Sequence, residues 1–255
     1  MNAEQVQQQF NLLRHRYSLP ASQFCVFPVL GSTNTKAWEL IQHSLPVAII
    51  ACQQTAGKGQ WGKAWVSETG GLYLSVATKW DVAIADSFHL VMATAVGIVN
   101  LLRHYGLPLE IKWSNDLILA SRKLGGIKIE TKIEGEKIKY AVVGIGINWS
   151  NQTPEIAINL QEDRKHSISS LTELAAITTA GILSGKQDYE TQGIEPIYQQ
   201  YQQLLNSIGR TVTIEGNQGV VTGVTSKGEL EVSLTSPGAT SRVYFFPGEI
   251  SLGYS

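Results

Sequence analysis

A glycine-rich, cationic loop is the part of the sequence whose residue types could do chemistry most directly. Residues 53–65 read QQTAGKGQWGKAW and follow an apolar run that is typical of a buried strand. Glycines permit tight turns and let backbone N–H groups approach an anion, and lysines add point charges. The loop therefore predicts an anion-binding element, built from Gly57, Lys58, Gly59 and Lys63.

Two common phosphate signatures do not explain this loop. Its glycines satisfy the pattern GxGxxG, but a dinucleotide fold needs a helix to begin there. Residues 65–67 and 72–76 instead have the composition of strands. The pattern GxxxxGK[ST] is absent, because Gly59 and not Ser or Thr follows Lys58. The remaining interpretation is an anion-binding loop that joins two strands.

A second group of candidate residues lies at 112–116, read KWSND, and at 123–128, read KLGGIK. Two strands joined by a hairpin would bring Lys112 and Lys123 to one rim of a sheet. A lysine there can neutralise a carboxylate or a phosphate, and an asparagine such as Asn115 offers a donor and an acceptor to a nucleobase. The alternative is a solvated, charged hairpin, since surface lysines and Asn-Asp turns are common.

A third candidate feature is the apolar strand 142–149, read VVGIGINW, in which Gly144 and Gly146 leave a strip without side chains. Glycine inside a strand often marks the close approach of a ligand. A bulge or tight packing against a helix is the alternative reading of the same pattern.

The remaining pattern shows which elements must position these residues. Helices are expected at 1–17, from Lys36 onward with Ser32 or Thr33 as cap, at 87–105, and at 171–183 and 189–205 with a break at Ser184-Gly185. Strands are expected at 24–30, 47–52, 110–113, 117–120, 127–133 and 138–147, the last four as an antiparallel meander. Short glycine-rich strands after residue 208 predict a separate small all-β module.

Composition limits the class of protein. The chain has 255 residues, 43% of them hydrophobic and 16% charged, with a formal net charge of −1. These values predict a globular protein without global attraction to DNA or membranes. Cys25 and Cys52 are expected as buried free thiols in a reducing cytoplasm, because they lack disulfide or metal spacing. The polar N-terminus is unlike a signal peptide, and no run is expected to span a bilayer.

Four segments in order resemble the biotin protein ligases. They are Gly31 to Asn34, Gln54 to Trp65, Lys112 to Asp116 with Lys123 to Gly126, and Gly144 to Asn148. Gly209-Arg210 and residues 248–252 also resemble the small SH3-like domain of that family. The resemblance implies an α+β fold with a mixed β-sheet packed by helices, like the class II aminoacyl-tRNA synthetases, over residues 1–207. A C-terminal SH3-like β-barrel is implied for 208–255.

The resemblance implies a two-step ligase reaction. Biotin's carboxylate attacks the α-phosphate of ATP, with Mg²⁺, to give biotinyl-5′-AMP and pyrophosphate. A lysine of the biotin carboxyl carrier protein of acetyl-CoA carboxylase then takes the biotinyl group. Preorganised cations and N–H groups would neutralise the charge that develops when two anions meet.

The resemblance also implies roles for single residues. Lys123 matches the lysine that contacts the biotin carboxylate and the α-phosphate, Lys112 its phosphate-binding companion, and Asp116 an aspartate that either holds Mg²⁺ or orients the incoming lysine. The family residues that hydrogen-bond the ureido ring of biotin are matched by Ser32, Thr33 and Gln54, and the backbone contacts of that pocket by Gly126 and Gly144. The anion loop is matched by Lys58, Gly59 and Lys63, a tryptophan near the nucleotide by Trp65, and the adenylate-binding asparagines by Asn115 and Asn148. The same segments supply further expected ligand-binding positions, namely Asn34, Gly57, Gln60, Ile127 and Gly146.

The sequence departs from the family pattern in the anion loop, where Lys58, Gln60 and Lys63 replace arginines. Two-pronged phosphate contacts become point charges or neutral hydrogen bonds, so weaker retention of the adenylate is expected. About twenty residues precede the first strand, so we expect a ligase without a DNA-binding domain. The alternatives are a non-catalytic sensor of biotin or adenylate and a lipoate ligase. A homodimer is expected only by analogy with the family.

Overall fold

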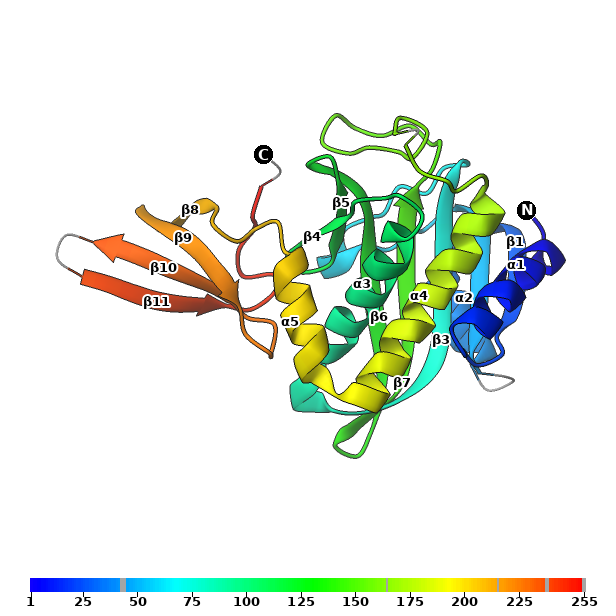
Figure 1. The fold of residues 1–255 in the computed structure, drawn as a ribbon, viewed down its shortest axis with the longest axis horizontal. Helices are drawn as coiled ribbons and strands as arrows, with labels where there is room; N and C mark the ends of the chain where they lie inside the picture. Colours follow the sequence, from blue (N-terminus) through cyan, green and yellow to red (C-terminus); the bar gives the residue numbers. More distant parts are fainter. Residues whose placement is uncertain (42–44, 164, 215, 237–238, 254–255) are drawn as a thin grey trace.

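A computed structural model describes residues 1–41, 45–163, 165–214, 216–236 and 239–253 of the chain. In this part the backbone forms one seven-stranded sheet and one four-stranded sheet. Three helices, α1, α3 and α4, lie against one face of the large sheet, and the small sheet lies at the far end beyond α5 (Figure 1).

The helices and strands have the following bounds. The helices are α1 (Ala3–Arg16), α2 (Thr33–Leu40), α3 (Phe88–Arg103), α4 (Leu171–Gln192) and α5 (Ile194–Leu204). The strands of the large sheet are β1 (Gln23–Leu30), β2 (Val47–Gln54), β3 (Gly71–Ala83), β4 (Glu110–Lys112), β5 (Asp116–Leu119), β6 (Arg122–Glu134) and β7 (Lys137–Asn148). The strands of the small sheet are β8 (Thr211–Ile214), β9 (Asn217–Val224), β10 (Leu230–Ser236) and β11 (Ala239–Phe245).

The large sheet has the order β1-β2-β3-β7-β6-β5-β4, with β1 and β2 parallel and the other neighbours antiparallel. Side chains alternate between its two faces, as the period of a strand requires. Ala48 and Ile50 of β2 belong to the main core under α3 and α4, whereas Val47 and Ile49 join a smaller core with Ala37 of α2. The second face is therefore covered by α2 over β2, β3 and β7, and α2 carries residues 33–34 to that face.

The two long helices α3 and α4 cross on glycines. A Cβ atom at Gly185 would lie 1.9 Å from the Ala93 carbonyl oxygen, and one at Gly97 would lie 2.2 Å from that of Gly181. The predicted helix break at Ser184-Gly185 is wrong for this reason: α4 runs through it, and Gly185 serves close helix packing. The break falls instead at Gly193, whose φ of 76° ends α4 and begins α5.

Two other predictions of secondary structure are also wrong. Helix α2 begins at Thr33 rather than near Lys36, and Ser32 stands at its N-cap without a capping hydrogen bond from its side chain. Residues 65–67 do not form a strand, because only Ser67 makes an isolated bridge, to Gln54. Trp65 turns instead into the cavity described below.

The small sheet has the order β11-β10-β9-β8 and is antiparallel throughout. The predicted fold class, a mixed sheet packed by helices with a separate β module at the C-terminus, is confirmed. Val221 and Leu230 of the module belong to the same buried cluster as α3 and α5. The proposed boundary between residues 207 and 208 therefore separates two sheets that share a continuous core.

Helix α3 corrects one expectation about membranes. Residues 84–103 are long and apolar enough, by length and composition alone, to cross a bilayer. In this structure 61% of the most apolar stretch is buried inside the protein, where α3 packs beside α4 on one face of the sheet. Its hydrophobicity is that of a core helix.

Candidate active site

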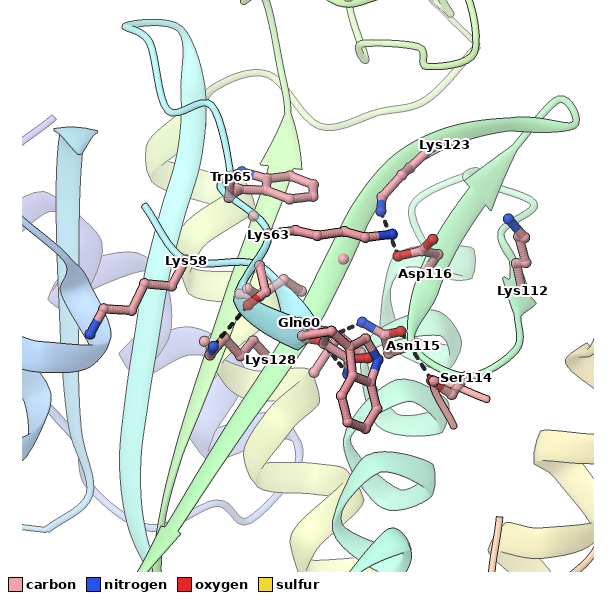
Figure 2. Close-up of a pocket in the computed structure, with 18 of the residues that line it drawn as sticks. Lys58, Gln60, Lys63, Trp65, Lys112, Ser114, Asn115, Asp116, Lys123 and Lys128 are labelled. Carbon is pink, nitrogen blue, oxygen red and sulfur yellow. Dashed lines mark hydrogen bonds and ion pairs between the residues drawn. The ribbon is translucent and has the colours of Figure 1, made fainter. Parts of the chain in front are cut away.

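A cavity of about 570 Å³ brings the predicted site residues together (Figure 2). It is lined from α2, the loop after β2, the turn between β4 and β5, strands β6 and β7, and the C-terminal segment 248–252. The predicted residues that line it are Ser32, Thr33, Asn34, Gln54, Lys58, Gly59, Gln60, Lys63, Trp65, Lys112, Asn115, Asp116, Lys123, Gly126, Ile127, Gly144 and Gly146. Segments separated by more than a hundred residues therefore form one site.

One end of the cavity is polar but uncharged. The backbone N–H of Thr33 donates to Gln54 Oε1 at 2.8 Å, and Gln54 Nε2 donates to Ser67 Oγ at 2.9 Å. Ser75 Oγ donates to Asn34 Oδ1 at 2.6 Å. The Nδ2 group of Asn34 is buried and has no hydrogen-bond partner within the described protein. Because a buried, unpaired donor is costly, this amide is a good candidate to bind a ligand oxygen.

The two glycines of β7 form the floor of this end. A Cβ atom at Gly144 would lie 2.2 Å from Asn34 Oδ1, and one at Gly146 would lie 2.4 Å from the indole nitrogen of Trp65. The strip without side chains is therefore needed to seat two lining side chains directly on the strand. Because Asn34 belongs to α2, the contact at Gly144 is the predicted alternative of tight packing against a helix, whereas Gly146 is covered by Trp65 from the loop after β2.

The glycine loop itself is folded by its own backbone. Gly59 N–H donates to the Lys63 carbonyl at 2.7 Å, and Lys63 N–H donates to that of Gln60 at 3.0 Å. Trp61 at the tip has a φ of 54°, which is uncommon outside glycine. The Gly57 carbonyl accepts from Trp65 N–H, and Gly57 shapes the turn without lining the cavity.

The other end of the cavity is cationic. The Lys123 ammonium lies 2.7 Å from an Asp116 carboxylate oxygen and 5.2 Å from the centre of the Trp65 ring (Figure 2). Lys58 is directed away from this group, and its Nζ donates to Thr35 Oγ1 at 3.3 Å. Lys63 is directed toward the Lys123–Asp116 pair (Figure 2). An anionic ligand at this end would therefore meet Lys123 and Lys63, with Asp116 holding the Lys123 ammonium in place.

Lys112 is the most buried of these cations, with 6% of its surface exposed. Burial lowers the pKa of its ammonium to about 8, and the positive charges of Lys123, Arg210 and Lys63 act in the same direction, while Asp116 opposes them. A buried ammonium beside other cations is favoured when an anion arrives. Lys112 is therefore suited to bind a phosphate.

The pH dependence of nucleotide binding should follow from this pKa. The ammonium form of Lys112 predominates below about pH 8 and is lost above it. For the ATP that the sequence resemblance implies as substrate, KM is therefore expected to be flat below that pH and to rise above it. Lys112→Arg keeps its charge at every accessible pH, and its KM should not change near pH 8. Steady-state kinetics from pH 6.5 to 9.5 would test this; the same inflection in both proteins would contradict the role of Lys112.

Two asparagines predicted at the adenylate lie differently. Asn115 lines the cavity, and its Nδ2 donates to the Ile127 carbonyl at 2.6 Å, which links the β4–β5 turn to β6. Asn148 does not line the cavity: its Nδ2 donates to the Ile158 carbonyl and its Oδ1 accepts from Asn151. Its assignment to the adenylate stays a prediction, and in this structure it fastens the loop after β7.

Several lining residues carry no prediction from the sequence. Lys128 of β6 donates from Nζ to the Gly59 carbonyl at 2.8 Å, and Trp61 and the segment 248–252 also face the cavity. Lys128 belongs to the candidate segment 123–128, but the sequence pattern assigns a role only to Lys123 of its two lysines. The approach of residues 248–252 depends on how the small sheet docks, which no local pattern encodes.

The described residues provide few ligands for a magnesium ion. No group of three or more His, Cys, Asp or Glu side chains in the described ranges could hold a metal. Mg²⁺ that accompanies a nucleotide is commonly held by phosphates and water with one or two carboxylates. Asp116 fits such a site only as a single ligand, and it is paired with Lys123 here.

Comparison with known proteins shows clear relatives. The profile of the Biotin/lipoate A/B protein ligase family matches residues 26–148. The chain is 30% identical over 230 residues to the bifunctional ligase/repressor BirA of Escherichia coli, which covers 83% of this chain and 70% of that protein. It is also 30% identical over 220 residues to the protein of the same name from Bacillus subtilis, covering 79% of this chain and 66% of that protein. The match thus spans just under two thirds of the Bacillus relative.

The fold also has close neighbours among solved structures. The biotin protein ligase from Aquifex aeolicus in complex with biotin and ATP superimposes with a TM-score of 0.67 at 22% identity, covering 91% of this chain and 99% of that one. At this identity the likeness concerns the fold. The resemblance inferred from the four sequence segments is confirmed by these relatives.

Proposed function

The chain belongs to the biotin/lipoate A/B protein ligase family, and we propose that it activates biotin with ATP and transfers the biotinyl group to a lysine of a carrier protein. One observation supports this most strongly: a single cavity joins a neutral polar end to a cationic end. Biotin has the same polarity, with a neutral ureido ring at one end and a carboxylate at the other. A nucleotide phosphate would extend the charged end.

In this proposal the neutral end holds the ureido ring. The unpaired Nδ2 donor of Asn34 suits the ureido oxygen, and Thr33 and Gln54, already bonded to each other, form the adjoining polar wall. Neutral partners suit a neutral ring, because an isolated charge buried there would cost free energy without a counter-charge.

The cationic end would carry out the chemistry. A biotin carboxylate oxygen attacks the α-phosphorus of ATP, and the bond to pyrophosphate breaks. Lys123 would neutralise both anions as they meet, and Lys112 would hold the phosphate. The carrier lysine's amine then attacks the acyl carbon, and AMP leaves. Asp116 would either orient that amine or serve as one Mg²⁺ ligand when ATP is bound with its metal.

The proposal also covers the carrier protein and the cellular compartment. The carrier would be the biotin carboxyl carrier protein of acetyl-CoA carboxylase, in the cytoplasm, where the free thiols Cys25 and Cys52 stay reduced. A homodimer through the sheet is part of the same analogy. Both thiols are free as expected, but they are half-buried and not fully buried.

The proposed function is tested by ATP-dependent incorporation of labelled biotin into a purified carrier domain, with lipoate as the competing substrate. Incorporation of biotin and not of lipoate is expected. Adenylate formation without transfer would favour a sensor, and incorporation of lipoate would favour a lipoate ligase.

The neutral residue Gln60 in the anion loop should limit how long the adenylate is retained. Its Nε2 lies 3.5 Å from the Ile127 carbonyl and carries no charge toward the cavity. Gln60→Arg should slow the dissociation of biotinyl-5′-AMP by about tenfold, the worth of one charge-assisted hydrogen bond. A chase of labelled adenylate measures this rate, with Gln60→Met as the uncharged control of similar length. Equal rates for Gln60→Arg and the parent would show that the loop departure has no effect on retention.

A further inference from the structure

Besides the long hydrogen bonds of Lys58 to Thr35 and of Gln60 to the Ile127 carbonyl, two closer contacts from outside the glycine loop hold it over the cavity. One is the hydrogen bond from Lys128 Nζ on β6 to the Gly59 carbonyl, at 2.8 Å. The other is the packing of the Trp61 ring against Gly248 in the C-terminal segment. Both pairs of residues line the cavity, so the loop closes it from the side while its neighbours fasten it at two points.

The Lys128 contact is an electrostatic fastening. Its side chain is about one quarter exposed and lies 3.9 Å from Glu130, beyond hydrogen-bond distance, while its bond to Gly59 is short. A charged donor to a carbonyl is stronger than a neutral one, and partial burial limits its screening by salt. The bond joins the loop to β6 of the rigid sheet.

The Trp61 contact joins the loop to the other domain. Trp61 is 68% exposed and has a positive φ, so no buried pocket of the catalytic domain accounts for its position. A Cβ atom at Gly248 would lie 2.7 Å from Trp61 Cε2, which means that the ring rests on a backbone free of side chain. The indole therefore needs glycine at position 248.

We infer that Lys128 and Trp61 are positioning residues that keep the glycine loop closed and so slow the escape of the acyl-adenylate. The inference rests on the proposed function for its ligand, but the closure itself concerns the ligand-free protein. Because the loop carries lysines and a glutamine where the family has arginines, its retention of the adenylate would depend on these two neighbouring contacts. In this proposal Lys128 and Trp61 act on the loop and do not touch the reacting atoms.

Trypsin cleavage of the ligand-free protein tests the closure directly. Lys58 and Lys63 lie within the loop with exposed side chains. A protease binds several consecutive residues in an extended form, so cleavage requires the hydrogen-bonded loop to open locally, and its rate follows the open population. Lys128→Met keeps the length of the side chain and removes the bond, and it should raise this rate by about tenfold. Lys128→Arg should restore slow cleavage. Lys132→Met, at an exposed lysine further along β6, is the control and should match the parent.

The second fastening is tested from the far side of the contact. Gly248→Ala would push the Trp61 ring away and should raise cleavage after Lys58 and Lys63, although the two positions are nearly 190 residues apart. Gly216→Ala is the matched control, because its φ of 82° imposes similar strain and nothing lies within 4 Å. Trp61→Ala should equal Gly248→Ala, and the pair should not be additive.

Adenylate release supplies the second readout. In Lys128→Met and Trp61→Ala, labelled biotinyl-5′-AMP should dissociate about tenfold faster in a chase, with the rate restored in Lys128→Arg. Unchanged cleavage in both variants would overturn the inference. So would faster release without faster cleavage, since that would mean direct contact with the ligand. If no adenylate forms at all, the proposed function fails, while the cleavage result still decides whether these residues close the loop.

Discussion

Lys123→Ala is expected to lower the rate of biotinyl-5′-AMP formation by up to about a thousandfold, the scale of losing a preorganised donor from a transition state. Its ammonium lies between Asp116 and the Trp65 ring, at the point where the cationic end of the cavity meets the neutral end. Lys63 of the glycine loop is directed toward the same pair (Figure 2), but only Lys123 is held there by an ion pair of 2.7 Å with Asp116.

Pyrophosphate release measures this step, and binding of biotin alone should change far less. Lys123→Ala also leaves Asp116 without its partner, so a loss of activity could reflect damage to the site. The double variant Lys123→Ala/Asp116→Asn removes the stranded charge, and it should recover thermal stability without recovering activity. Lys139→Ala, at an exposed ion pair with Asp81, serves as the control. Near-normal pyrophosphate release by Lys123→Ala would contradict the assignment.

The residues of the site could be predicted better than their arrangement. Lys112, Asn115 and Lys123 are recognisable because chemistry requires those types in short, contiguous motifs, and the structure places all three at one cavity. Lys128 and Gly248 act through partners far away in the sequence, at Gly59 and Trp61. Their roles depend on the docking of elements, which local patterns do not specify.

The fold shows the same division. Most strands and helices follow from alternation and helical period, because a segment must bury one face. The role of a glycine, by contrast, depends on the residues that surround it in the folded protein. Gly185 permits two helices to touch and Gly193 ends one, yet both are simply glycines between helix-forming residues. A residue without a side chain carries no information about what will occupy the space that it leaves.

For the same reason, we expect Gly144 to be the position at the neutral end of the cavity that is most sensitive to an added side chain. In Gly144→Ala, the new methyl would lie 2.2 Å from Asn34 Oδ1, so the Asn34 amide must move. The movement would break its bond from Ser75 and withdraw the unpaired Nδ2 donor from the cavity. Overpacking and a lost hydrogen bond together should weaken biotin binding by about a hundredfold.

Titration calorimetry with biotin alone measures this loss without relying on turnover. A double-mutant cycle with Asn34→Ala identifies its cause. If the methyl acts by displacing Asn34, then removing that side chain makes room for it, and Gly144→Ala/Asn34→Ala should bind biotin no more weakly than Asn34→Ala alone. Additive losses would place the methyl in the path of the ligand itself, and undiminished affinity in Gly144→Ala would remove the neutral end from the biotin site.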